Sequence, residues 1–277
     1  MALLSGKLIA ERLLSGIKER LAHASVTPGL AVVLVGDYLE SHKYVGLKEE
    51  RAKEVGVRFE KFLFPTTVHY SEVMSCIEVL NGRDDIHGVI VQLPLPDGFP
   101  TDEIIECIAP EKDTDGFHKE TLKRFLLGDA TACPVFPRAI VELIRETKLS
   151  FHGERGVAVV NSELMGKVLA FALSLEGIAS EYVLQSEGRE AIALKTRDAK
   201  VVVTACGVPD LITASMLSAD AVVIDGGNVH VNDRVQGDVK REEVANHVAF
   251  LSPVPGGVGP VTVATLLTRV TDAALTK

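Results

Sequence analysis

Hydrophobic and polar residues follow two different periods along the first half of the chain. Short, continuous apolar runs, which are typical of strands buried on both faces, occur at 30–35 (LAVVLV) and 88–92 (GVIVQ), and 58–64 alternates as a strand does. Apolar residues at helical spacing predict helices in the first twenty residues and over 41–55, 70–81 and 101–108. Strands that alternate with helices are typical of βαβ units, so the pattern predicts a parallel sheet.

The same pattern restarts in the second half. A helix at 137–147 precedes buried strands at 156–160, 201–204 and 221–224, a helix at 167–175, and a last helix from residue 261. We therefore predict an α/β protein of two α/β domains. The first spans 1–136, with the C-terminal helix 261–277 packing back on it, and the second is a Rossmann-like nucleotide-binding domain over 137–260.

One lysine breaks the pattern of the helix 41–55. The stripe that should face inward consists of Ser41, Tyr44, Val45, Lys48, Ala52 and Val55. Lys48 either packs its stem on apolar surface and extends its ammonium to water, or faces a cleft with a lowered pKa and exchanges protons near neutral pH. Tyr44 lies one turn earlier on the same face, where its ring is able to stack on a flat substrate.

The ends of two strands locate a candidate cleft. Gln92 closes the strand 88–92, and the sequence LPLP after it cannot continue a ladder because proline lacks an amide proton. Ligands of open α/β sheets bind at the carboxyl ends of the strands. The segment after Val35 and Gln92 both lie at such ends, so we expect Lys48 and Gln92 to line one cleft.

Two loops are rich in turn-forming residues. The segment 110–117 (PEKDTDGF) fits an ordinary surface turn, since Asp-Gly is common turn chemistry. The segment 251–262 (LSPVPGGVGPVT) has three prolines and three glycines, and a flexible linker would be richer in serine and less apolar. The second loop is therefore predicted to be a shaped binding loop.

The turn after the strand 156–160 lacks the dinucleotide fingerprint G-x-G-x-x-G. Ser162 and Gly166 still provide a hydroxyl and a close backbone approach at a helix N-terminus, which favours phosphate. The alternative is a plain βα turn capped by the serine. Asn228, which follows the strand 221–224, either contacts a ribose or belongs to a simple turn.

Charge and composition restrict the partners. The 277 residues carry a net charge of −9 with no basic block, which argues against nucleic acid and anionic membranes. The four cysteines lie far apart and the eight histidines are scattered, so we predict no metal site and reduced thiols. The N-terminal segment lacks the continuous apolar core of a signal peptide, and a cytoplasmic location is expected.

Four motifs occur together in order: Ser41-x-x-Tyr44-Val45-x-x-Lys48, the sequence VQLPLP from Val91, the sequence KDTDGF from Lys112, and PVPGGVGP from Pro253. In this combination the chain closely resembles the methylenetetrahydrofolate dehydrogenase/methenyltetrahydrofolate cyclohydrolase family, the bifunctional FolD-type enzymes. The resemblance extends from Leu4-Ser5-Gly6-Lys7 to the last helix.

This resemblance implies one active site in a cleft between a folate domain and a Rossmann-like domain. It implies that 5,10-methylenetetrahydrofolate gives a hydride to a nicotinamide cofactor, usually NADP, and that the methenyl product is hydrolysed to 10-formyltetrahydrofolate. It further implies tetrahydrofolate derivatives as ligands and a homodimer.

Site roles also follow from the resemblance. Lys48 matches the proton-transfer lysine of hydrolysis, and Gln92 the residue that hydrogen-bonds it. Tyr44 matches the aromatic residue that stacks on the aminobenzoyl ring, Asp115 the carboxylate that fixes the pterin, and Ser41 belongs to the same substrate-binding motif. The loop along the folate corresponds to Pro255, Gly256 and Gly257.

On the cofactor side, the matching residues are Asn161, Ser162, Gly166, Ser186, Gly207, Pro209 and Asn228. Val160-Asn161-Ser162 replaces the usual Gly-Arg-Ser, Val168 replaces a proline, and Val135-Phe136 replaces Cys-Thr. An arginine would grip the extra phosphate of NADP, which the uncharged Asn161 does not, and Val160 is expected to crowd the cofactor. NAD is therefore the alternative cofactor. A cyclohydrolase with a degenerate cofactor site and a non-catalytic folate-binding protein are the alternative functions.

Overall fold

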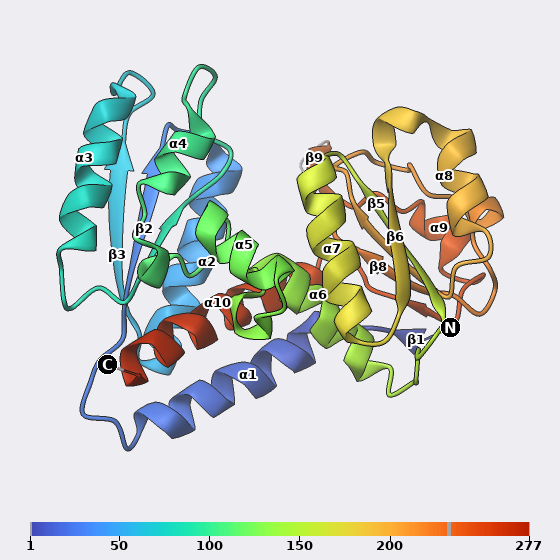
Figure 1. Cartoon of the computed structure of the whole chain (residues 1–277), viewed down its shortest axis with the longest axis horizontal. Coiled ribbons are helices and arrows are strands. Elements are labelled where there is room, and N and C mark those ends of the chain that lie inside the picture. Colours follow the sequence, from blue (N-terminus) through green and yellow to red (C-terminus); the bar gives the residue numbers. More distant parts are fainter. Residues whose placement is uncertain (1, 232–233, 277) are drawn as a thin grey trace. The chain divides into compact units, whose positions relative to one another are not determined.

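The computed structural model describes residues 2–231 and 234–276 and divides into two compact α/β units (Figure 1). One unit, here called the Lys48 unit, consists of Glu11–Val135 and Val263–Lys277. The other, here called the large-sheet unit, consists of Met1–Ala10 and Phe136–Thr262.

The α-helices are α1 (Gly6–Leu21), α2 (Leu39–Val55), α3 (Tyr70–Asn81), α4 (Thr101–Glu106), α5 (Lys119–Leu126), α6 (Val135–Glu146), α7 (Glu163–Leu175), α8 (Arg189–Thr196), α9 (Arg241–Val244) and α10 (Val258–Leu275). The strands are β1 (Ala2–Leu3), β2 (Gly29–Val35), β3 (Arg58–Phe64), β4 (Gly88–Val91), β5 (Arg155–Val160), β6 (Ala179–Leu184), β7 (Val201–Ala205), β8 (Val222–Asp225), β9 (Val229–Val231), β10 (Arg234–Gln236) and β11 (Phe250–Leu251). Short 3-10 turns are η1 (Pro110–Lys112), η2 (Ala130–Ala132), η3 (Gln185–Glu187) and η4 (Ala214–Met216).

The Lys48 unit is built on a parallel three-stranded sheet of order β3-β2-β4. Every residue of β2 is buried, because both faces of the sheet are covered. Ala31, Val33 and Val35 pack with apolar residues of α3 and α4 on one face, while α2 packs on β2 and β3. This covering explains why β2 is a continuous apolar run.

Helix α2 has the register that the sequence predicts. Its buried residues are Ser41, Val45, Lys48, Ala52 and Val55, and Tyr44 is half-buried beside them. The helix ends at Gly56, whose φ of 86° lies in the left-handed region that glycine adopts without steric cost. The inward orientation of Lys48 is therefore confirmed.

The large-sheet unit has a parallel six-stranded sheet of order β1-β11-β8-β7-β5-β6. The chain runs from β5 outward to β6 and then returns to β7 on the other side of β5, so the order reverses between β5 and β7. Helix α7 packs on β5 and β6 (Figure 1). A Cβ at Gly166 would come within 2.5 Å of the Tyr182 ring, so the glycine lets α7 approach β6 closely.

The two-domain α/β class is confirmed, and every predicted strand and helix exists with small shifts at its ends. The sequence pattern missed α5, β6, α8, α9, β1, β11 and the hairpin of β9 and β10. The last helix begins at Val258, three residues before its predicted start. Residues Ala2–Leu3 pair with β11, so the start of the chain joins the large sheet and not the unit to which 1–136 was assigned. The functional assignment of these ranges stays a prediction.

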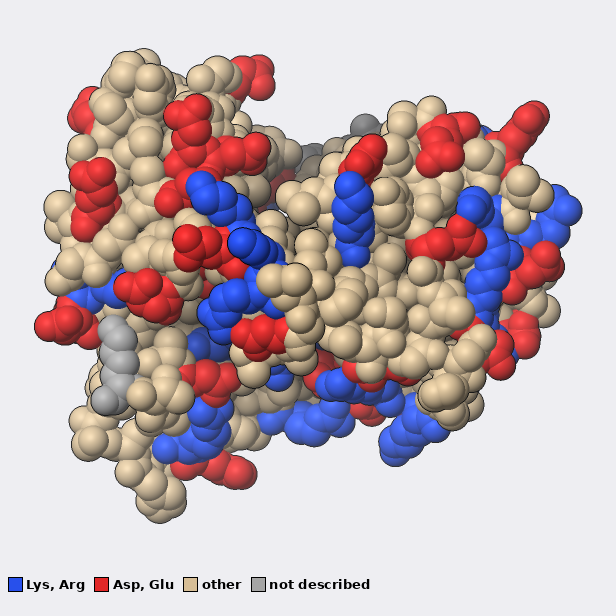
Figure 2. Space-filling model, in the orientation of Figure 1, with Lys and Arg blue, Asp and Glu red and all other residues tan. Residues whose placement is uncertain are grey.

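The surface carries both signs of charge. On the face that Figure 2 shows, basic and acidic side chains are interspersed. Several of the ion pairs of the described residues are exposed, among them Lys167–Glu163. Such exposed pairs add little stability. In the part of the chain that the structure describes, no helix is both long and apolar enough to cross a membrane.

Candidate functional site

Lys48 is buried in the Lys48 unit, with 6% of its surface exposed. Its ammonium donates to Oε1 of Gln92 at 2.9 Å and lies 4.7 Å from the centre of the Tyr44 ring. The amide nitrogen of Gln92 donates to the Leu93 carbonyl at 2.7 Å, which orients the amide so that its oxygen faces Lys48. The structure thus brings three predicted site residues together, and the explanation in which Lys48 reaches to water is wrong.

The surroundings of Lys48 change its acidity. Burial lowers the pKa of Lys48 to about 8, because a charged ammonium loses hydration there, and the Asp115 carboxylate partly opposes this. A lysine of this kind gives and accepts protons near neutral pH. Its environment therefore suits acid–base work.

Asp115 acts on the same group of side chains. Burial raises the pKa of Asp115, while the charges of Lys48 and Arg269 lower it. The pKa of Tyr44 is raised by burial and by the Asp115 charge. Tyr44, Lys48, Gln92 and Asp115 therefore form one site within the Lys48 unit.

A buried lysine anchors the loop that carries Asp115. Lys112 donates to the carbonyls of Leu80, Asn81 and Arg83 at 2.9, 2.7 and 2.6 Å. These carbonyls lie in the last turn of α3 and just after it, where the helix dipole favours a cation. The three bonds from Lys112 attach the loop to the end of α3.

The neighbouring aspartate folds the loop. The buried Asp113 carboxylate accepts from the backbone N–H groups of Gly116 and His118, both at 2.9 Å. The interpretation of 110–117 as a surface turn is wrong, since Lys112, Asp113, Thr114 and Gly116 are buried. Sequence reasoning missed Lys112 and Asp113 as positioning residues, although their place in a shared motif was a usable signal.

The predicted folate loop belongs to the large-sheet unit. Pro255, Gly256 and Gly257 connect β11 to α10, and Gly256 has a φ of 102°. The Gly6 N–H donates to the Gly256 carbonyl at 2.9 Å, and a Cβ at Gly257 would lie 2.5 Å from the Pro253 carbonyl oxygen. The glycines are thus required by a tightly folded loop, and their contact with folate stays a prediction.

The predicted cofactor residues gather at one edge of the large sheet. Because β5, β6, β7 and β8 are parallel, the turns that follow them lie at the same edge, which includes the point where the strand order reverses. These turns carry Asn161, Ser162, Ser186, Gly207, Pro209 and Asn228. All of them except the half-buried Pro209 are exposed. The edge therefore fits a dinucleotide, whereas Gly166 is buried against Tyr182.

The turn between β5 and α7 is shaped by its serine. Ser162 caps α7, and its hydroxyl accepts from the Met165 N–H at 3.4 Å. Val160 and Val168 are fully buried, with 0% and 1% of their surfaces exposed. The structure therefore gives no support to the expected crowding by Val160, whose side chain lies in the core. Of the changes at this turn, Asn161 is the one that faces solvent.

Two buried carboxylates hold the turns after β7 and β8. Asp238 accepts from the N–H groups of Cys206 and Val208 at 2.7 and 2.8 Å, on both sides of Gly207. Asp225 accepts from the N–H groups of Gly227, Asp238 and Val239. Sequence reasoning missed Asp238, because its partners lie about thirty residues earlier in the chain. These bonds fix the backbone that presents Gly207 and Asn228.

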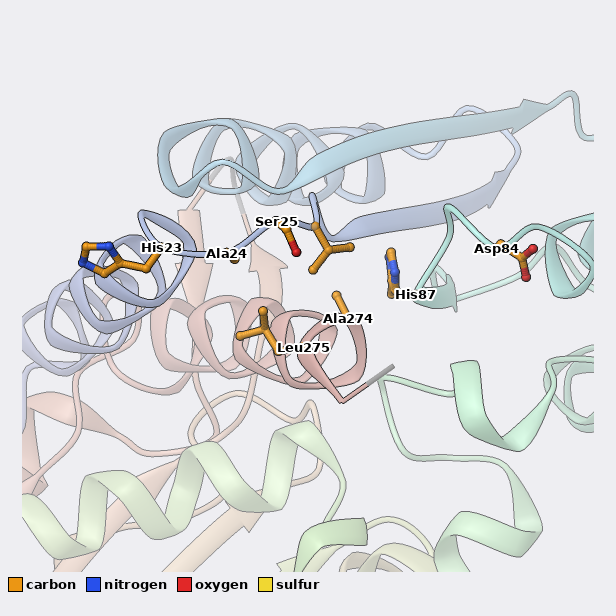
Figure 3. Close-up of a pocket in the computed structure, with 8 residues that line it drawn as sticks. His23, Ala24, Ser25, Asp84, His87, Ala274 and Leu275 are labelled. Carbon is orange, nitrogen blue, oxygen red and sulfur yellow. The ribbon is translucent and has the colours of Figure 1, made fainter.

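Other candidate features do not coincide with this chemistry. A cavity of about 550 Å³ in the Lys48 unit is lined by His23, Asp84 and His87 among others, but His23 and Asp84 lie at opposite ends (Figure 3). Within the described ranges there is no group of three or more His, Cys, Asp or Glu side chains that could hold a metal ion. All four cysteines are free thiols.

The fold and the site define a two-domain α/β enzyme with a buried lysine of lowered pKa in one unit and a sheet edge of the dinucleotide-binding type in the other. Residues 4–115 match the catalytic domain of the tetrahydrofolate dehydrogenase/cyclohydrolase family, and residues 134–277 match its NAD(P)-binding domain. The chain belongs to the tetrahydrofolate dehydrogenase/cyclohydrolase family.

Individual relatives agree over nearly the whole length. The chain is 37% identical over 272 residues to the bifunctional protein FolD of Methanosarcina mazei, covering 97% of this chain and 94% of the relative. The crystal structure of a bifunctional FolD from Campylobacter jejuni has a TM-score of 0.93 at 31% identity and covers 100% and 99% of the two chains. The Trypanosoma brucei FolD structure, complexed with NADP and an inhibitor, has a TM-score of 0.94 at 28% identity and covers 99% and 97%.

Family membership confirms the resemblance that the motifs carry. The chain is an enzyme of folate-dependent one-carbon metabolism with dehydrogenase and cyclohydrolase activities, and its nicotinamide cofactor is confirmed. The main prediction is favoured over a monofunctional cyclohydrolase and over a non-catalytic binding protein. The roles of individual site residues stay predictions.

Proposed function

We propose that this chain oxidises 5,10-methylenetetrahydrofolate with NADP or NAD and hydrolyses the resulting 5,10-methenyl cation to 10-formyltetrahydrofolate, with Lys48 as the proton-transfer residue. The observation that carries this assignment is the buried Lys48 ammonium, bonded to Gln92 at 2.9 Å, with its pKa lowered to about 8. A base that works beside a cationic substrate must be able to exist in a neutral form, and this lysine meets that condition.

Hydrolysis requires water to add to the methenyl carbon and one proton to leave. Neutral Lys48 accepts a proton from the attacking water as the new C–O bond forms. The proton that remains on the new hydroxyl group then passes to N5 as the C–N bond to N5 breaks and the C=O bond forms. The formyl group thus remains on N10, and the proton accepted by Lys48 is the one released overall. Gln92 holds the Lys48 nitrogen in place, because its own amide is fixed by the Leu93 carbonyl.

The substrate is held by side chains around Lys48. Tyr44 offers its ring to the aminobenzoyl group, and Asp115 accepts paired N–H bonds from the pterin, as a carboxylate with two oxygens can. Ser41 lies one turn before Tyr44 on the buried face of α2. Pro255, Gly256 and Gly257 are assigned to the folate chain on the basis of the family motif.

The cofactor is assigned to the open edge of the large sheet. Bound there, the nicotinamide ring supplies the hydride acceptor. Ser162 and the first turn of α7 suit a phosphate group, and Ser186, Gly207, Pro209 and Asn228 follow neighbouring strands at the same edge. Gly166 serves the site indirectly by letting α7 pack on β6. Asn161 is exposed and uncharged, so we propose only a weak preference for NADP over NAD.

The direct test assays the two half-reactions separately by absorbance. We expect methenyl hydrolysis, and oxidation of the methylene compound with both NAD and NADP. Hydrolysis without oxidation under either cofactor would identify a cyclohydrolase that has lost its dehydrogenase activity. Binding of folate without either reaction would contradict the enzyme assignment.

We also propose that the chain forms a homodimer in the cytoplasm. The family resemblance supports the dimer, and the four free thiols suit a reducing compartment. Light scattering after size-exclusion chromatography would give the mass of the particle, and a mass near 30 kDa would contradict the dimer, because the chain itself is 29.8 kDa.

A further inference from the structure

Arg269 on α10 contacts the backbone on both sides of Asp115. Its Nη1 donates to the Cys133 carbonyl at 2.9 Å, and its Nη2 donates to the Asp113 carbonyl at 3.3 Å. A Cβ at Gly116 would lie 2.7 Å from Nη1, so the guanidinium rests against the bare Cα of that glycine. All of these residues belong to the Lys48 unit.

The charges that face Asp115 come from three elements. Lys48 and Tyr44 lie on α2, Asp113 lies on the same loop as Asp115, and Arg269 lies on α10. Burial and Asp113 favour the protonated form of Asp115, whereas Lys48 and Arg269 favour the carboxylate. Of these two cations, Lys48 loses its charge readily and Arg269 does not.

We propose that Arg269 is a positioning residue that clamps the Asp115 loop and supplies a positive charge beside Asp115 that, unlike the charge of Lys48, is not lost when a proton is transferred. The inference rests on the proposed function, because only a proton-transferring Lys48 passes through a neutral form during turnover. At that moment Asp115 would face burial and the Asp113 carboxylate with no compensating charge from α2. A protonated Asp115 would lose acceptor capacity toward the pterin, and substrate binding would weaken.

The first measurement reads the charge of Asp115 directly and needs no turnover. Aspartate carboxyl carbons are labelled with ¹³C, the Asp115 signal is assigned with Asp115→Asn, and its titration midpoint is measured without folate. In Arg269→Gln we expect a midpoint on the order of one pH unit higher than in the unmodified protein. Arg269→Lys, which keeps the charge, should stay close to the unmodified protein.

Arg20→Gln is the matched control, because Arg20 also pairs with a residue of α10, Asp272 at 2.6 Å, but does so at the surface. It should leave the midpoint unchanged. If Arg269→Gln does not fold, Arg269→Met is the second neutral variant. An unchanged midpoint in a folded neutral variant, or an equal shift in Arg269→Lys, would overturn the proposal.

The second measurement separates this electrostatic role from a merely structural one. KM and kcat for methenyl hydrolysis are compared at pH 6 and pH 8.5, after subtraction of the uncatalysed rate. In Arg269→Gln we expect KM to rise more at pH 6 than at pH 8.5, because the raised midpoint leaves more of Asp115 protonated at the lower pH, with kcat changed by less than about threefold. An equal rise in KM at both pH values, shared by Arg269→Lys, would mean that Arg269 only holds the loop. If the unmodified protein does not hydrolyse the methenyl compound, the proposed function is refuted. The titration would still show whether Arg269 lowers the pKa of Asp115.

Discussion

Lys48 combines features that stability alone would not favour. A lysine that is 6% exposed has lost most of its hydration, and its bond to Gln92 replaces only part of it. The ring of Tyr44 at 4.7 Å and the charge of Asp115 supply further compensation. The charged and neutral forms of Lys48 are therefore close in free energy near pH 8, as proton transfer by a lysine requires.

Lys48→Met is predicted to lower methenyl hydrolysis by about 10²-fold or more, the usual loss when an acid–base group is removed. Methionine fits the apolar stripe of α2, so the protein should still fold. Lys43→Met, on the exposed face of the same helix, is the control and should hydrolyse normally. Stopped-flow or steady-state absorbance assays of the purified variants measure their rates of methenyl hydrolysis. Near-normal hydrolysis in folded Lys48→Met would remove Lys48 from the mechanism.

The same substitution is predicted to change how stability depends on pH. The pKa of Lys48 is about 8 in the folded protein, against roughly 10.4 when unfolded, so the unfolded state holds more protons between these values. The cost of burying the charged lysine is therefore full below about pH 8 and fades as pH rises towards 10.4. Relative to Lys48→Met, the unmodified protein should gain on the order of 2 kcal/mol between pH 7 and pH 9.5. Urea unfolding at both pH values measures this difference, and a constant difference would argue against a lowered pKa.

At the scale of elements, the turns after the parallel strands determine which side chains are exposed at the edge of the large sheet. The β5–α7 turn is fixed by the Ser162 cap and by the close packing of Gly166 on Tyr182. Val160 and Val168 lie in the core on either side of it, and Asn161 alone of the changed residues is exposed. Selectivity between NAD and NADP should therefore depend on Asn161 more than on the two valines.

Asn161→Arg is predicted to tighten NADP binding by about 10- to 150-fold, because a charged hydrogen bond to the extra phosphate contributes about 1.5–3 kcal/mol. NAD binding and methenyl hydrolysis should barely change. Asn161→Gln, which is longer but uncharged, is the control. Titration calorimetry with each cofactor measures the effect. Strong NADP selectivity in the unmodified chain would contradict this prediction and would direct attention to Ser186 and Arg189.

At the scale of the whole molecule, the two compact units hold different parts of the chemistry. Tyr44, Lys48, Gln92 and Asp115 belong to one unit, and the sheet edge to which we assign the cofactor belongs to the other. Asp225 and Asp238 accept hydrogen bonds from the backbone of the turns at that edge. Burial raises the pKa of Asp225 to about 6. Substitution of these carboxylates should therefore weaken cofactor binding and the dehydrogenase activity, and leave methenyl hydrolysis largely unchanged.

Asp238→Asn is predicted to weaken NADP binding by about tenfold, because an amide nitrogen cannot accept the second of the bonds from Cys206 and Val208. Methenyl hydrolysis should stay within about twofold of normal, since the Lys48 site lies in the other unit. Asp198→Asn, an exposed position of the same unit, is the control. Thermal melts of both variants check folding. Parallel loss of hydrolysis and cofactor binding would show that Asp238 stabilises the whole molecule.

Local periodicity was enough to define much of this protein. The strand 30–35 and the stripe of α2 were predictable, because burial on two faces or on one helical face leaves a signal within a few residues. The inward position of Lys48 followed from that stripe. Strand β6 was missed because it lies at the edge of its sheet, where only Val183 is fully buried and no continuous apolar run is needed.

Only the tertiary structure decided how the site residues are held. Lys112 reaches carbonyls about thirty residues earlier, Asp238 reaches Cys206 across 32 positions, and Arg269 reaches Asp113 across 156. Bonds between segments so far apart depend on the folded path of the chain, and they leave no periodic trace in the sequence. The sequence by itself therefore determined which residues face inward, and the fold determined which charges they meet, because electrostatic interactions act through space and not along the chain.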